Sequence, residues 1–185
     1  MGMIDSKLIN LKTTSITSHF VNGNEYSLVN EGNKKFYVKK SPDNIVNDSF
    51  NDVGNSLKGA TDAARKELKK KYKQTPVVLC ARSNIALIKC KSTHPLGCVW
   101  LVESKIKDIS PDQNGHTVVL MKDGSTIRVA MNCKELQENR EKASYLCKIF
   151  LDRSNFEDTT YPDSSHLPKT GVKRYKINPQ PSPIK

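Results

Sequence analysis

The strongest fold signal in this chain is the segment TVVLMKDGSTIRVA, residues 117–130. Residues 117–121 and 126–130 are rich in β-branched and apolar side chains, and Lys122-Asp123-Gly124-Ser125 separates the two runs. An Asp-Gly pair in this position is typical of a β-hairpin, because glycine readily takes the positive φ that tight turns require. The segment therefore predicts two antiparallel strands.

Similar runs continue the strand pattern toward the N-terminus. They lie at Glu25–Val29, Lys35–Lys39, Val77–Cys80, Ile85–Lys89, Cys98–Val102 and Lys105–Ile109. The turn residues Asn30–Asn33 and Ala81–Asn84 stand between consecutive runs, as hairpins require. Residues 1–20 are polar with weak apolar spacing, and they predict only a short strand or a frayed end.

Residues 60–73 predict a helix, because they contain no Gly or Pro and many good helix formers. Thr61 or Asp62 is the expected N-cap. The apolar side chains recur at helical spacing, at Ala64, Leu68 and Tyr72. This stripe is narrow, so one side of the helix docks on the protein and its many lysines face solvent or a ligand.

A second helix is expected over Cys133–Leu151, where apolar residues again follow one stripe. Residues 45–59 are rich in Asn, Asp and Ser and indicate a connector with short helical turns. The whole pattern predicts an α+β fold with antiparallel hairpins. We expect a flexible or short-strand N-terminus over 1–19, one folded domain over 20–151 and a flexible, Pro-rich basic tail over 152–185.

The positive charge is concentrated in one part of the sequence. The net charge is +11, and residues 58–100 hold ten Lys and Arg against two acids, which accounts for eight of these charges. A patch of this kind attracts polyanions, nucleic acid first and an acidic membrane surface second. The alternative is a solvated helix face that keeps the protein soluble.

Catalytic and membrane functions have little support in the sequence. It contains no Walker A, dinucleotide-binding or HExxH motif, so we expect neither an enzyme nor a cofactor. No stretch approaches 18 consecutive apolar residues, and residues 1–10 lack the apolar run of a secretory signal. These features predict a cytoplasmic protein without a membrane partner.

The five scattered cysteines indicate reduced thiols rather than a disulfide framework. A Cys98/His94 nucleophile is one alternative. A second alternative is a zinc site, for which the ligand types would come from Cys80, Cys90, His94 and Cys98. Their C-x9-C-x3-H-x3-C spacing lacks the tight knuckles of most structural zinc sites, and we assign no metal ligand.

Three stretches in a fixed order carry a family resemblance. They are Ile45-Val46-x-x-Ser49 with Gly54-x-Ser56-x-x-Gly59; Ile85–Ile88 with Ser92-Thr93-His94-Pro95 and Cys98-x-Trp100-Leu101; and Thr117–Gly124, followed by a strand and a helix with Leu136. Together, over about residues 20–151, they resemble the ComK-type competence transcription factors of low-GC Gram-positive bacteria. The chain departs from the family pattern at Ala60-Thr61, where a basic residue is usual, and at Lys89-Cys90, where Pro-Thr is usual.

The resemblance implies a DNA-binding activator that acts as a homo-oligomer on paired A/T-rich boxes through the minor groove. It further implies control of promoters for DNA-uptake genes, with a proteolytic adaptor and RNA polymerase as protein partners. If this divergent member reads DNA shape, Arg or Lys entering a narrow A-tract minor groove is the physical means.

The expected DNA contacts cluster at and before the basic helix. They are Asn55, Ser56, Lys58, Arg65, Lys66, Lys69, Lys70, Lys71 and Lys73. Cations on a helix bind backbone phosphates and release counterions, which gives affinity without sequence preference. Ser56 is alternatively a helix cap, and Trp100 is expected in the core because it lies in an apolar run. A different hypothesis is a protein-interaction module of a regulatory or proteolytic system, whose basic helix docks an acidic partner.

Overall fold

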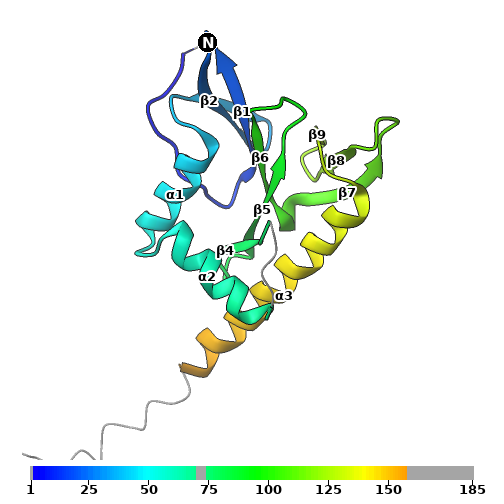
Figure 1. Ribbon diagram of the computed structural model, residues 1–185. Coiled ribbons are helices and arrows are strands. Elements are labelled where there is room, and N and C mark those ends of the chain that lie inside the picture. The colour runs from blue at the N-terminus through cyan, green and yellow to red at the C-terminus, as the bar shows by residue number, and fades with distance from the viewer. Residues whose placement is uncertain (1, 70–73, 158–185) are drawn as a thin grey trace, which may run out of the picture.

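The computed structural model describes residues 2–69 and 74–157, and it has the predicted α+β architecture (Figure 1). A six-stranded antiparallel sheet has the order β3–β2–β1–β6–β5–β4, with bounds Lys34–Val38, Asn24–Glu31, Thr13–Val21, Cys98–Val102, Ile85–Lys91 and Val77–Cys80. A three-stranded sheet has the order β7–β8–β9, with bounds Ile106–Pro111, Thr117–Met121 and Thr126–Val129. The predicted strands are all present, including both strands of the Asp-Gly hairpin.

The N-terminal segment, for which a short strand or a frayed end is expected, contains the long strand β1. It is nine residues long and lies inside the larger sheet, between β2 and β6, and residue 20 falls within it. The turn to β2 is Asn22-Gly23, with φ of 51° and 79°, as in the two-residue turn that favours hairpins. The polar side chains of this strand obscure the strand pattern in the sequence, but they have hydrogen-bond partners inside the fold. For example, Asn30 Nδ2 donates to Ser15 Oγ at 2.8 Å.

Helix α1, Pro42–Asp52, replaces most of the connector expected over 45–59. Ser41 caps its N-terminus and Pro42 occupies the first turn, where a missing N–H costs nothing. Ile45, Val46 and Phe50 are fully buried, and they share one face of the helix at i, i+1 and i+5. The Asn and Asp residues that suggested a connector belong largely to the other faces of an amphipathic helix.

Helix α2, Leu57–Glu67, is shorter than the helix expected over 60–73 and is shifted toward the N-terminus. Its N-cap is Ser56, whose Oγ accepts a hydrogen bond from Gly59 N at 3.0 Å, and not Thr61 or Asp62. The helix stops because Lys69 has a φ of +52°, outside the right-handed helical region. Lys70, Lys71 and Lys73 lie outside the described residues.

Helix α3, Cys133–Glu157, begins where the sequence predicts and continues six residues beyond Leu151. Asn132 precedes it, and its Oδ1 accepts from Glu135 N at 2.8 Å, which is a helix N-cap. Residues 152–157, the start of the expected tail, are therefore helical. Residues 158–185, the rest of that tail, lie outside the described residues.

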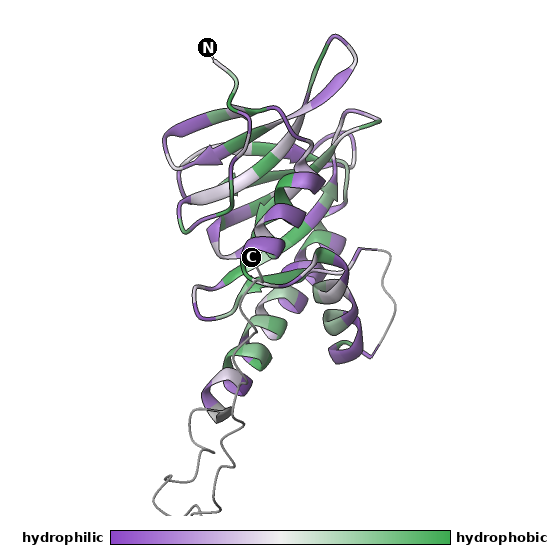
Figure 2. Ribbon diagram, turned by 90° about the vertical axis from the view of Figure 1, so that its left-hand side faces the viewer, coloured by the Kyte–Doolittle hydropathy of each residue, from purple (hydrophilic) through white to green (hydrophobic). Residues whose placement is uncertain are grey.

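The helices cover both faces of the larger sheet (Figure 1). Alternate residues of the central strands point to opposite sides: Leu87 and Trp100 pack with α1, whereas Ile88 and Leu101 pack in the core that α3 shares with the smaller sheet. Along helices and strands, hydrophilic and hydrophobic residues alternate, as elements with one buried face require (Figure 2). No helix within residues 2–69 and 74–157 is long and apolar enough to cross a bilayer.

Helix α2 passes the edge strand β4 and joins the two cores. Leu57 and Ala60, in its first half, pack with the α1 core, while Ala64 and Leu68 pack with the α3 core. Its last turn is linked to α3, because Glu67 Oε2 lies 2.7 Å from Arg153 Nη2. The hydrogen bond from this guanidinium lowers the pKa of the Glu67 carboxyl. The opposite side of α2 faces outward.

Candidate nucleic-acid interface

The Gly54-x-Ser56-x-x-Gly59 motif forms the joint between α1 and α2. Gly54 has a φ of +74° and donates its N–H to Asn51 O at 3.0 Å, which closes the end of α1. Asn55 Oδ1 accepts from Ser56 N at 2.7 Å. A Cβ at Gly59 would lie only 3.0 Å from Asn55 Oδ1 and 3.1 Å from Ser56 Oγ, so the motif leaves room for both capping side chains.

Asn55 and Ser56 are therefore capping residues, and both remain exposed. The Ser56 hydroxyl accepts from the backbone but keeps its own hydrogen, which an anion at the helix N-terminus can accept. The first N–H groups of α2 lack partners within the helix and point the same way. This end of α2 can therefore bind a phosphate while it remains capped.

We use the term α2 face for the expected cations that the structure describes. They are Lys58, Arg65, Lys66 and Lys69. Lys58, Lys66 and Lys69 are exposed and form no ion pair within the described residues. Arg65 is half-buried, and its Nη1 lies 3.8 Å from Asp62 Oδ1. Three of these charges are thus available to an external anion, and the fourth is shared with a carboxylate.

A groove of about 520 Å³ lies between α1 and α2. Its lining residues are Asp43, Asn44, Asn47, Leu57, Lys58, Thr61, Asp62 and Arg65. Two cations and two carboxylates line it, and the amides and the hydroxyl can form hydrogen bonds in either direction. The groove itself is polar and of mixed charge, so the charge run in the sequence does not produce a uniformly basic surface here.

Asp43 connects this groove to the sheet. Its Oδ2 lies 2.6 Å from Lys89 Nζ, and its Oδ1 accepts from Trp100 Nε1 at 2.8 Å. Lys89 Nζ also lies 5.5 Å from the centre of the Trp100 ring. Trp100 is only 4% exposed, which confirms that it belongs to the core. Because Trp100 is the single tryptophan, its fluorescence reports on the sheet beneath this groove.

The arrangement of the cysteines supports neither the nucleophile nor the zinc site that the sequence left as alternatives. Cys90 packs in the α3 core, whereas Cys80 and Cys98 pack at the α1 core on the other side of the sheet. Burial raises the pKa of the Cys90 thiol to about 12, and burial together with nearby Asp43 raises that of Cys98 to about 11. A protonated thiol is a poor nucleophile. Within the described residues, no group of three or more His, Cys, Asp or Glu side chains is placed to hold a metal.

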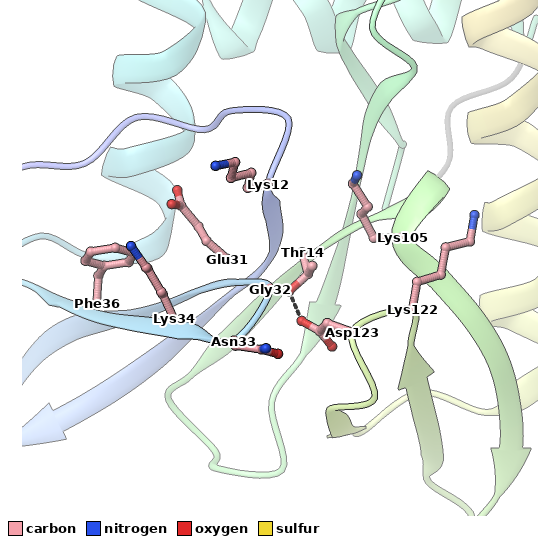
Figure 3. Close-up of a pocket in the computed structure, with 10 residues that line it drawn as sticks. All are labelled: Lys12, Thr14, Glu31, Gly32, Asn33, Lys34, Phe36, Lys105, Lys122 and Asp123. Atoms are coloured by element: carbon pink, nitrogen blue, oxygen red, sulfur yellow. Dashed lines mark hydrogen bonds between the residues drawn. The ribbon is translucent and has the colours of Figure 1, made fainter.

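The structure contains a second basic site that the sequence analysis does not predict (Figure 3). It is a hollow of about 540 Å³, which we call the lysine trough, lined by Lys12, Thr14, Glu31, Gly32, Asn33, Lys34, Phe36, Lys105, Lys122 and Asp123. Its four lysines come from the segment before β1, the start of β3, the 3-10 helix Glu103–Lys105 and the β8–β9 turn. They are dispersed over the sequence, so no local charge pattern predicts the site.

A profile of the ComK family, described as "ComK protein", matches residues 4–155. The chain belongs to the ComK family. The match confirms the family resemblance and extends it to a larger part of the chain than residues 20–151. ComK proteins are competence transcription factors, not enzymes. No curated protein and no solved structure matches the chain.

Proposed function

We propose that this ComK-family chain is a transcription regulator that binds double-stranded DNA through the α2 face. The observation that carries the proposal is a group of three exposed lysines, Lys58, Lys66 and Lys69, which have no ion pair among the described residues and lie on and just after a helix whose capped N-terminus is also open. Ammonium groups placed in this way neutralise backbone phosphates and release counterions. Lys70, Lys71 and Lys73 would continue the same contact along the chain.

Phosphate contacts position a protein on DNA but do not read its sequence. For this lysine-rich helix, the shape of DNA is the better source of preference, because A-tracts narrow the minor groove and strengthen its negative potential. Arg65 or a neighbouring lysine would enter that groove. Asn55 and Ser56 would bind phosphate at the helix N-terminus.

The remaining parts of the proposal follow from family membership. The chain would act in the cytoplasm, at the nucleoid, as a homo-oligomer on paired A/T-rich boxes, with residues 20–151 as its DNA-binding domain. It would activate genes for DNA uptake, with RNA polymerase and a proteolytic adaptor as protein partners. No cofactor or metal is needed for this activity.

Fluorescence anisotropy with labelled duplexes tests the proposal. A duplex with spaced A- and T-tracts should bind much more tightly than a G/C-rich duplex of the same length. The double variant Lys58→Ala/Lys66→Ala should weaken binding to both, and the slope of log K against log salt should fall by about 1.8, or 0.9 for each phosphate contact.

The matched control is Lys134→Ala/Lys148→Ala, which removes two exposed lysines from α3 with no described ion pair. It should change the slope little. Equal affinity for both duplexes would remove the preference for A/T-rich DNA, and absence of binding at low salt would remove DNA binding altogether. Salt-sensitive binding to an acidic protein, with none to DNA, would favour the protein-interaction module instead.

A further inference from the structure

The lysine trough has the features of a second phosphate-binding surface. Lys12 and Lys34 lie on one side of it and Lys105 and Lys122 on the other, with Thr14, Gly32, Asn33 and Asp123 between them (Figure 3). None of the four lysines forms an ion pair or a side-chain hydrogen bond within the described residues. Two rows of unpaired ammonium groups therefore border a hollow.

The backbone holds the lysines of each row in place. Lys122 N donates to Lys105 O at 2.8 Å, so these two residues are neighbours although 17 positions apart in the sequence. On the other side, Lys12 N donates to Asn10 Oδ1 at 2.8 Å, and Lys34 pairs with Glu31 across β2 and β3. Thr14 Oγ1 donates to Asp123 Oδ2 at 3.1 Å and joins the two sheets beneath the hollow.

The two carboxylates of the trough are already engaged elsewhere. Glu31 Oε1 lies 3.0 Å from Lys7 Nζ and also accepts from Asn10 Nδ2 at 2.7 Å. Asp123 is partly buried, which opposes ionisation, but hydrogen bonds from Ser125 and Thr14 outweigh this and lower the pKa of its carboxyl. Glu31 is therefore neutralised by Lys7, Asp123 is held by neutral donors, and neither acid forms an ion pair with the four lysines among the described residues.

We infer that the lysine trough binds backbone phosphates of the same DNA duplex that contacts the α2 face; this inference rests on the proposed function. A small phosphorylated ligand would share the chemistry, but tight small-anion sites usually offer backbone N–H groups from a helix N-terminus or a nest. The trough instead offers mobile point charges on its two sides, with three of the four lysines exposed. Several weak, dispersed contacts of this kind suit an extended polyanion.

The test is the double variant Lys34→Ala/Lys105→Ala, which removes one lysine from each side. Affinity for the A/T-tract duplex and for the G/C-rich duplex should fall by the same factor, at least about tenfold at 0.1 M salt, and the salt slope should fall by about 1.8. The ratio of the two affinities should stay constant, because phosphate contacts do not read sequence.

The matched control is Lys35→Ala/Lys107→Ala. Lys35 follows Lys34 on the same strand and so points to the other face, and neither control lysine lines the trough. Both double variants remove two positive charges. Equal losses in the two would show only an effect of net charge and would overturn the inference. Thermal unfolding of each variant verifies that the fold is unchanged.

Two further outcomes separate the possible failures. If Lys58→Ala/Lys66→Ala weakens DNA binding but Lys34→Ala/Lys105→Ala does not, the trough inference fails and the proposed function stands. If the unmodified chain binds no DNA, both fail together. Inorganic tripolyphosphate, titrated by calorimetry, serves as the small-anion probe: saturable binding that needs Lys34 and Lys105, with DNA affinity unchanged in the variant, would also overturn the inference.

Discussion

The α2 face and the lysine trough present positive charge in different ways. On α2 the cations are close in sequence, but Asp62 lies beside Arg65. In the trough the lysines come from four separate segments, and the acids between them are already bound to other donors. The difference shows that a charge run along the chain does not by itself locate the surfaces where lysines gather.

The structural elements that form the α2 face and the lysine trough also differ. The α2 face belongs to one helix at the edge strand β4, held by the caps of its first turn and by the Glu67–Arg153 pair at its last. The trough lies where the larger and smaller sheets meet. Under the proposed function, α2 carries the side chain that enters a narrow minor groove, whereas the lysines of the trough contact only backbone phosphates. We therefore expect sequence preference to depend on α2 and general affinity to depend on both regions.

The largest expected effect comes from changing both regions at once. The variant Lys58→Ala/Lys66→Ala/Lys34→Ala/Lys105→Ala should lose affinity by the product of the two double-variant factors, and its salt slope should fall by about 3.6. Losses multiply when two independent surfaces contact the same molecule. Anisotropy titrations at several salt concentrations measure both quantities. If the quadruple variant binds DNA no more weakly than the double variant with the lower DNA affinity, the two surfaces do not share one duplex.

A smaller effect is expected from the glycine turns that shape each region. Gly54 at the α1–α2 joint and Gly32 in the trough both have positive φ, and a Cβ at either would meet no atom within 4 Å. Gly54→Ala and Gly32→Ala should each lower the free energy of unfolding by about 1–2 kcal/mol, because an L-residue is strained in this conformation. Urea unfolding followed by Trp100 fluorescence measures the loss.

The two glycine variants should differ in their DNA binding. Gly54→Ala disturbs the start of α2, so it should reduce the ratio of A/T-tract to G/C-rich affinity. Gly32→Ala changes the floor of the trough, so it should reduce both affinities and leave the ratio unchanged. An equal effect of the two variants on the ratio would contradict the separate roles of the two regions.

Much of the fold is predictable from local sequence, as the smaller sheet illustrates. Residues 117–121 are predicted as a strand and form β8 with the same bounds, because apolar β-branched residues next to an Asp-Gly turn have few other stable conformations. Strand β1 is not predicted from local sequence because its buried positions include the polar residues Thr13, Thr14 and Ser15. Hydrogen-bond partners distant in sequence stabilise these side chains in the core. The Asn22-Gly23 turn is the local signal that could have revealed it.

The two basic regions differ in the same way. The motif around Ser56 and the lysines after it are contiguous, so the sequence points to α2 even though the helix bounds expected from it are too late. Lys12, Lys34, Lys105 and Lys122 become neighbours only when β1 pairs with β2 and the β8–β9 turn docks on Thr14. Long-range pairing creates this site, and a single sequence carries no signal for it.

The smallest expected effect removes one carboxylate from each region. Asp62→Asn should raise DNA affinity a few-fold, because it frees Arg65 and removes one negative charge beside the α2 face without breaking a buried contact. Asp123→Asn removes one negative charge from the trough and should also raise affinity for both duplexes. Anisotropy at low salt measures the gain, and unchanged affinity in Asp62→Asn would argue against a DNA contact by α2.

The two aspartate variants separate again in their stability. The pKa of Asp123 is lower in the folded chain than in the unfolded chain, so ionisation of this carboxyl stabilises the fold at neutral pH. That contribution is complete above the unfolded pKa and disappears as the pH falls through the folded pKa. Asp123→Asn should therefore unfold at lower urea than the unmodified chain at pH 7, and the difference should shrink below about pH 4. Because Asp62 is exposed and its Arg65 contact is long, Asp62→Asn should unfold at the same urea concentration as the unmodified chain at pH 7. A constant difference for Asp123→Asn between pH 7 and pH 3 would mean that the charge of Asp123 does not hold the two sheets together beneath the trough.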